Sequence, residues 1–313
     1  MTTTRILSRK APAELGIGIA FVAECILLSH LSPYFLTTEN LLNVSLQASI
    51  TAIIAAGMTF VILTGGIDLS VGSLVAFAGI ITTDILRIHL PLPVAILAGL
   101  SVGAASGAFA GVCVTRFNIT PFIVTLALMT IWRGAAFVYT EGRPIWELPE
   151  SFGLLGAGRV LEVPIPTLMM VIVYTVSHIV LTRTKFGRYV YAVGGNREAA
   201  RLAGIRTDRV LVQVYVVCGM LAAMSGILLA SRMNSGQPNA GLMYELDVIA
   251  AVVVGGTSLF GGRGSIIGTF IGAMLIAVLR NGLNLLNVGS YVQQVVVGAV
   301  ILLAVLMDQW RRR

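Results

Sequence analysis

Long apolar runs follow one another along almost the whole chain, and short polar stretches separate them. A run of about 20 apolar residues forms a helix long enough to cross the hydrocarbon core of a bilayer. The pattern therefore predicts an all-α, polytopic membrane protein with about ten transmembrane helices. The expected spans are 14–32, 41–63, 70–88, 92–115, 119–139, 164–182, 210–231, 246–260, 265–286 and 290–308, of which the eighth is short.

Composition agrees with this pattern. Hydrophobic residues make up 57% of the chain and charged residues only 11%, whereas soluble domains carry about 25% charged residues. We expect a single transmembrane domain over 1–313. The net charge of +7 is spread between the apolar runs and forms no continuous basic patch, so nucleic acid is not an expected partner.

The basic residues also predict how the chain lies in the membrane. Fifteen of the 21 Lys and Arg residues fall on the side that holds the N-terminus, among them Arg5, Arg9 and Lys10. Because cytoplasmic loops carry the excess of Lys and Arg, both termini and the loop 183–209 are expected in the cytoplasm. The loop 141–163 then lies outside, as a partner contact or a linker. Segment 232–245 also lies outside, as a linker or a re-entrant turn.

The most polar stretch is 183–209, which we call the basic island. It holds seven Lys or Arg residues and two acids. Within it, Asn196–Gly204 is typical of a two-turn helix, with Asn196 as N-cap, Glu198 in the first turn, Arg201 near the last and Gly204 just past the end. So short a helix is marginally stable without a packing partner. It is therefore expected to dock onto another protein.

A few polar residues lie inside or beside the apolar runs. Asp68, in the stretch Gly65–Ser73, either caps the third span or takes part in gating or the solute path with Gly65 and Gly66. The amides of Gln47, Asn281 and Asn284 suit the hydroxyls of a neutral sugar, but they serve equally well as hydrogen bonds between helices. Glu24, in the first span, has no evident partner.

Glycines recur every fourth residue at Gly99, Gly103, Gly107 and Gly111, and again over 264–272. That spacing puts each set on one helix face. The faces serve either plain helix packing or a dimer contact or gate.

Signatures of catalysis are missing from the sequence. It contains no phosphate-binding loop, no HExxH and no GxSxG serine, and its three cysteines and three histidines are scattered. The chain is expected not to be an enzyme and to bind no cofactor or metal.

Three stretches, GGIDLSVGS at 65–73, FGRYVYAVGGNREAARLAGI at 186–205 and the Gly-rich run at 244–273, resemble the permease subunits of bacterial ABC importers for monosaccharides of the ribose kind. The similarity extends over about 32–307. Glu198, Ala199, Ala200 and Gly204 also match the EAA-three-residues-Gly pattern of importer permeases, although the later Leu-Pro of that pattern is absent.

The resemblance implies a ten-helix permease in the bacterial inner membrane that works as a pair, either a homodimer or a related heterodimer. It implies that Asn196–Gly204 is a coupling helix resting on a separate ATPase subunit, which binds ATP and Mg. It further implies that a periplasmic sugar-binding protein delivers the solute.

Two other classes remain open from the residues. An ion-coupled secondary transporter or channel needs no ATPase, but it is expected to carry intramembrane carboxylates, and only Glu24 and Asp68 qualify. An integral membrane enzyme is disfavoured by the missing catalytic groups.

Overall fold

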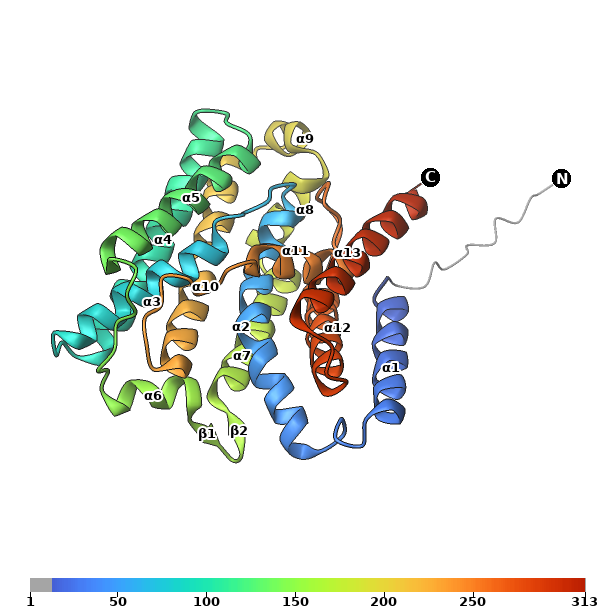
Figure 1. Cartoon of the computed structure of the whole chain (residues 1–313). Coiled ribbons are helices and arrows are strands. Elements are labelled where there is room, and N and C mark those ends of the chain that lie inside the picture. The colour runs from blue at the N-terminus through green and yellow to red at the C-terminus, as the bar shows by residue number, and fades with distance from the viewer. Residues whose placement is uncertain (1–12, 313) are drawn as a thin grey trace.

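The computed structural model describes residues 13–312, so Arg5, Arg9 and Lys10 lie outside the described residues. Over this range the chain is an all-α bundle with one very short hairpin (Figure 1). The elements are α1 (Ala13–Leu31), α2 (Thr38–Leu63), α3 (Val71–Arg87), α4 (Leu92–Arg116), α5 (Pro121–Thr140), α6 (Glu150–Ala157), β1 (Arg159–Val160), β2 (Val163–Pro164), α7 (Ile165–Arg183), α8 (Lys185–Gly195), α9 (Arg197–Leu202), α10 (Thr207–Met233), α11 (Tyr244–Val254), α12 (Ile266–Leu285) and α13 (Ser290–Arg312).

Within the described residues, six helices are long and apolar enough to cross a membrane, namely α2, α4, α5, α7, α10 and α12. Nine of the ten expected spans coincide with a helix to within a few residues at each end. The protein is thus a polytopic membrane protein, as the sequence predicts.

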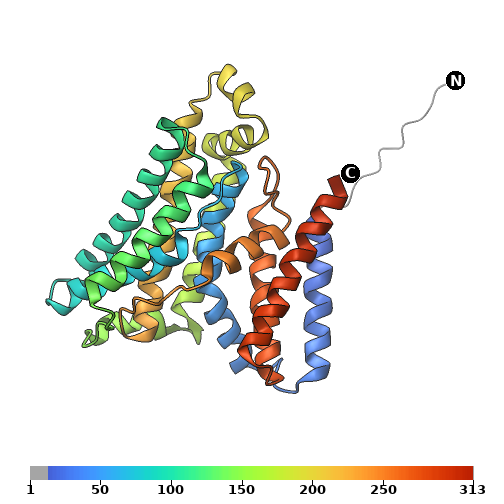
Figure 2. The ribbon, with the colours of Figure 1, turned by 45° about the horizontal axis from the view of Figure 1, so that its top comes forward.

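Helix α2 runs through the middle of the bundle, with α7, α10, α11 and α12 packed around it (Figures 1 and 2). From Ala48 to its end at Leu63 all but one of its residues are buried. Small side chains make this possible, because they let neighbouring backbones approach closely. At Gly57, for example, a Cβ atom would lie 2.9 Å from the Cα of Cys218 in α10.

The glycines of α4 pack against α10. A Cβ at Gly103 would lie 2.3 Å from the carbonyl oxygen of Gly219, and one at Gly107 would lie 2.2 Å from that of Tyr215. The ridge is therefore covered inside the subunit. This confirms the helix-packing interpretation and makes the dimer-contact interpretation of these α4 glycines wrong.

The eighth expected span, 246–260, is wrong as a full span. Helix α11 has 11 residues, a length of about 16 Å, which is too short to cross a bilayer. It ends at Val254 because Gly255 packs against the backbone of Gly268, where a Cβ would lie 2.6 Å from the carbonyl oxygen. A non-helical loop of glycines then leads to α12.

Non-helical chain also precedes α3 and α11, and parts of both segments are buried inside the protein. Arg133 of α5 donates 2.7 Å hydrogen bonds to the carbonyls of Pro238 and Ala240, just before α11. A Cβ at Gly72 would lie 2.5 Å from the carbonyl oxygen of Gly241, so the two helices begin side by side. Irregular backbone at membrane depth requires such burial, since its polar groups find no partner in lipid.

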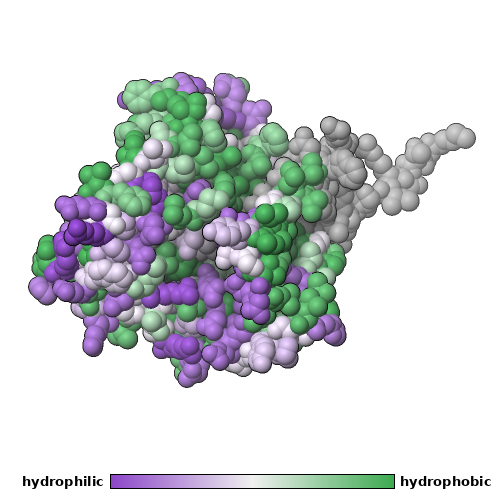
Figure 3. Space-filling model, viewed as in Figure 1, coloured by the Kyte–Doolittle hydropathy of each residue, from purple (hydrophilic) through white to green (hydrophobic). Residues whose placement is uncertain are grey.

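On the face seen in Figure 3, hydrophilic residues spread over the left side and the lower part, and a smaller group lies at the upper end. One end of the bundle carries α9, and the opposite end carries α6 and the β1–β2 hairpin (Figure 1). The stretch 141–163, which the sequence predicts as a loop, contains α6 and the start of the β1–β2 hairpin. We call these ends the α9 end and the hairpin end.

Candidate functional site

The basic island forms two short helices, α8 and α9, which project from the α9 end (Figure 2). The side-chain oxygen of Asn196 accepts a 2.9 Å hydrogen bond from the backbone N–H of Ala199 and caps α9. Gly204 has a φ of +82° and ends the helix in the left-handed conformation. The predicted helix, its N-cap and its terminal glycine are confirmed.

Helix α9 is exposed on most of its surface. Ala200 is buried against the protein, whereas Glu198, Ala199 and Arg201 face solvent and Leu202 is 83% exposed. An isolated helix of six residues is marginal in water. Leu202 therefore offers an apolar side chain on a surface that is free to contact another protein.

Helix α8, which the sequence did not predict, joins α9 to the body of the protein. Tyr191 donates a 2.9 Å hydrogen bond to the carbonyl of Gly264, in the loop between α11 and α12. The backbone of Gly194 fits closely against the carbonyl of Leu63 at the end of α2. The same carbonyl accepts a 2.9 Å bond from the N–H of Gly262. Helix α8 therefore contacts both the end of α2 and the α11–α12 loop, so a movement of α8 would displace both.

Asp68 lies in the buried segment before α3 and is only 1% exposed. Its Oδ1 accepts hydrogen bonds from the backbone N–H of Ser70 at 2.9 Å and from the Ser70 hydroxyl at 2.6 Å. The carboxylate thus holds the turn just before α3. Its partner Ser70 is the residue that precedes the first helical position, and the Ser70 side chain makes no cap bond, so the capping interpretation stays a prediction. Gly65 and Gly66 make none of these hydrogen bonds with the carboxylate; they line a separate pocket of about 290 Å³.

The candidate amides do not converge on one site. Asn281 exchanges two hydrogen bonds with Asn40, at 2.8 and 3.0 Å, and Asn284 accepts one of 2.7 Å from Gln293. These bonds join α12 to α2 and to α13, which is the role of hydrogen bonds between helices. Glu24 in α1 has both carboxylate oxygens buried with no partner among the described residues.

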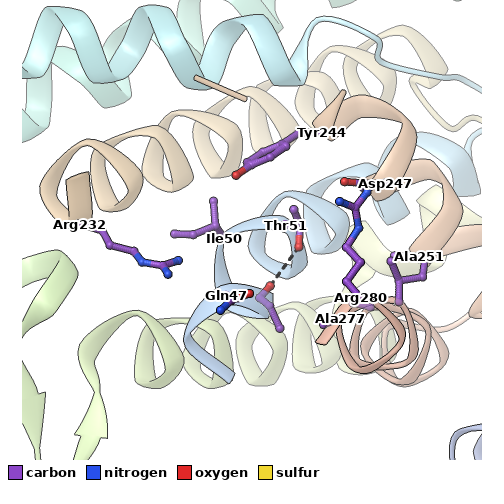
Figure 4. Close-up of a pocket in the computed structure, with 12 residues that line it drawn as sticks. Gln47, Ile50, Thr51, Arg232, Tyr244, Asp247, Ala251, Ala277 and Arg280 are labelled. Atoms are coloured by element: carbon purple, nitrogen blue, oxygen red, sulfur yellow. Dashed lines mark hydrogen bonds and ion pairs between the residues drawn. The ribbon is translucent and has the colours of Figure 1, made fainter. Parts of the chain in front are cut away.

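Gln47 lies elsewhere, at a cavity of about 270 Å³ that we call the polar pocket (Figure 4). The pocket lies between α2, α10, α11 and α12, toward the hairpin end. Its polar lining comes from Gln47, Thr51, Arg232, Tyr244, Asp247 and Arg280.

One side of the polar pocket is formed by an ion pair (Figure 4). Arg280 of α12 donates from Nη2 to Oδ1 of Asp247 in α11, at 2.5 Å. Asp247 is 12% exposed, and the Nε of Arg280 is buried with no partner among the described residues. Neither residue is among the site residues predicted from the sequence. The two lie 33 positions apart, and only the fold brings them together.

Comparisons with known proteins place the chain. A family model described as the permease component of branched-chain amino acid transport systems matches residues 40–305. The chain belongs to this family. The permease is 49% identical over 294 residues to the ribose import permease protein RbsC of Escherichia coli K12, covering 93% of this chain and 92% of that protein. It is 47% identical to RbsC of Bacillus subtilis 168, over 95% of this chain and 92% of that protein.

A more distant relative is the D-allose transport system permease protein AlsC of Escherichia coli K12, which is 35% identical to the permease over 98% of both chains. No solved structure matches the permease. The resemblance seen in the sequence is confirmed: this chain is a permease subunit of an ABC importer and not itself an enzyme.

Proposed function

We propose that this permease carries a ribose-like monosaccharide into the bacterial cytoplasm, using ATP hydrolysed with Mg by a separate ATPase subunit. The relatives at 46–49% identity are ribose import permeases, and those for D-allose and L-arabinose are more distant. Residues 1–313 form one transmembrane domain in the inner membrane, which is crossed by the long helices α1–α5, α7, α10, α12 and α13, with α11 too short to cross. A periplasmic sugar-binding protein and a second permease copy, identical or related, complete the importer.

The observation that carries the proposal is the capped, exposed helix α9. In it we assign Glu198, Ala199 and Arg201 to the contact with the ATPase, while Asn196 and Gly204 end the helix and Ala200 packs it against the rest of the subunit. The caps hold a short helix in place, and exposed Leu202 offers an apolar anchor for the partner.

Movement of α9 reaches the membrane through α8, because α8 contacts the ends of α2 and of the α11–α12 loop. Closure of the ATPase on ATP then rocks the packed helices between states open to one side and to the other. In this scheme Gly65, Gly66 and Asp68 form the break before α3 that changes shape. Gln47 serves the polar side of the solute path, and Asn281 and Asn284 hold the neighbouring helices together.

Two substitutions in α9 test the coupling. Gly204→Pro removes the N–H that bonds to the Arg201 carbonyl and cannot adopt a φ of +82°. Glu198→Arg reverses a charge on the exposed face. We expect both to abolish ATP-driven uptake while membrane insertion and dimerisation stay intact. Normal uptake by both variants would show that α9 does not couple to the ATPase.

An ion-coupled transporter or channel is the alternative class. In the described residues, Glu24 and Asp68 are the carboxylates suited to ion coupling on sequence grounds, and the Asp68 carboxylate is already bonded to Ser70. Reconstitution into proteoliposomes separates the classes. Sugar uptake driven by an ion gradient, with no ATPase present, would overturn the proposed function.

A further inference from the structure

We infer that the polar pocket of Gln47, Thr51, Arg232, Tyr244, Asp247 and Arg280 is a binding site, within the single subunit, for a neutral polyhydroxylated solute. The inference rests on the proposed function, sugar import, and goes further by naming the groups that hold the solute (Figure 4).

The size of the pocket suits a small sugar. Its volume of about 270 Å³ lies just below that of drug-sized ligand pockets, which begin at about 300 Å³. Its floor contains the alanines Ala251, Ala273 and Ala277, whose small side chains leave this space open. Larger residues at these positions would close it.

Charged groups are costly at membrane depth and mark functional sites there. Asp247 and Arg280 pair across two helices, and the pair leaves donor and acceptor capacity unused. The pair is joined through Nη2 and Oδ1, and the Arg280 side chain remains 39% exposed, so other N–H groups of its guanidinium are open to a solute. Such a pair accepts hydrogen bonds from one sugar hydroxyl and donates to the next.

The remaining groups complete a lining of the same kind. The Gln47 amide can both donate and accept, and Tyr244 combines a flat apolar ring with a hydroxyl. Figure 4 shows Gln47, Arg232 and Tyr244 around one space from three elements. Small-ligand sites are usually concave, and a small number of polar groups that point into them orient the ligand.

At the Asp247–Arg280 pair the charges favour a neutral solute over an anion, because each neutralises the other. Arg232, the other cation of the lining, lies exposed at the edge, where solvent screens its charge. A phosphate or carboxylate placed at the centre would face the Asp247 carboxylate and be repelled.

Occupancy can be measured with a cysteine in the pocket. In the complete importer, Cys25, Cys113 and Cys218 are replaced by alanine and Thr51→Cys is introduced. A membrane-impermeant thiol reagent is applied with and without ribose. We expect ribose to slow labelling at position 51 in a saturable manner. Leu161→Cys, at the hairpin tip where Leu161 is 93% exposed, is the control. It is expected to label at the same rate with and without ribose.

Asp247→Asn keeps the shape of the side chain and removes its charge. We expect about tenfold more ribose to be needed for the same protection, as for the loss of a charge-assisted hydrogen bond. Asp84→Asn is the matched control, since Asp84 also pairs with an arginine, Arg87, but outside the pocket. It should leave the protection curve unchanged. A merely structural Asp247 would instead change the labelling rate without ribose and leave the ribose dependence as it was.

Other outcomes separate the two claims. Labelling that ribose does not slow, in an importer that takes up ribose through the cysteine-free chain, overturns the pocket alone. Protection by ribose 5-phosphate but not by ribose also overturns it, since the site would then bind anions. An importer in which even the unmodified chain takes up no sugar overturns the proposed function, and the pocket inference with it.

Discussion

At the scale of single residues, Asn196 and Gly204 decide whether α9 exists as a helix. The Asn196 side chain supplies the missing acceptor at one end, and Gly204 adopts the left-handed conformation at the other. In a helix of six residues, packing and propensity contribute little, so each cap accounts for a large share of its stability.

We expect Asn196→Ala to destabilise α9 by about 1 kcal/mol. The docking-competent form is then less populated, and ATP-driven uptake falls several-fold while the amount of inserted protein is unchanged. Asn239→Ala, on an exposed loop of the hairpin side, is the control and should transport normally. Uptake measured in membrane vesicles at matched protein levels provides the comparison. Equal uptake by the two variants would mean that the cap is dispensable.

Local signals of this kind were readable from the sequence, because a cap and its helix lie within a few residues. Asp247 and Arg280 were not, since their spacing along the chain carries no signature until α11 and α12 pack together. The same holds for Asn40 and Asn281, whose reciprocal hydrogen bonds join residues 241 positions apart.

At the scale of elements, the contact between α4 and α10 is the most extensive in the structure, and glycine makes it possible. Gly107 faces the backbone of Tyr215, which cannot move aside as a flexible side chain could. By contrast, nothing lies within 4 Å of a Cβ placed at Gly134 in α5.

Gly107→Ala is therefore expected to destabilise the protein by about 1–3 kcal/mol through overpacking. Gly134→Ala should be neutral or slightly stabilising, since alanine has the higher helix propensity. Thermal unfolding of the two detergent-solubilised variants beside the parent checks this. A melting temperature for Gly107→Ala equal to that of Gly134→Ala would contradict the packing described for α4 and α10.

The lengths of the hydrophobic runs predicted most of these helices, but they gave α11 as a full membrane span. Apolar residues continue past Gly255 and Gly256, so the pattern gives one long run, whereas the backbone turns there to let α12 approach. Helix α8 was missed for a related reason. Its polar and aromatic residues carry no membrane signal, and its packing against Leu63 and Gly264 is visible only in three dimensions.

At the scale of the whole molecule, α9 and the β1–β2 hairpin lie at opposite ends of the bundle (Figures 1 and 2). From the positive-inside rule we propose that the basic island, and with it α9, lies in the cytoplasm. In that orientation the hairpin faces the periplasm, where the proposed binding protein delivers its solute. Leu202 and Leu161, 83% and 93% exposed, mark the two ends.

Single cysteines at these positions, in the chain whose natural cysteines are alanine, report the orientation. With an impermeant reagent on cells with a permeabilised outer membrane, we expect Leu161→Cys to label at once. Leu202→Cys should label only after the inner membrane is opened, because the bilayer separates the reagent from α9. Addition of the ATPase subunit should then protect position 202 and leave position 161 unchanged. Labelling of Leu202→Cys in sealed cells would reverse the orientation and place α9 out of reach of any cytoplasmic ATPase.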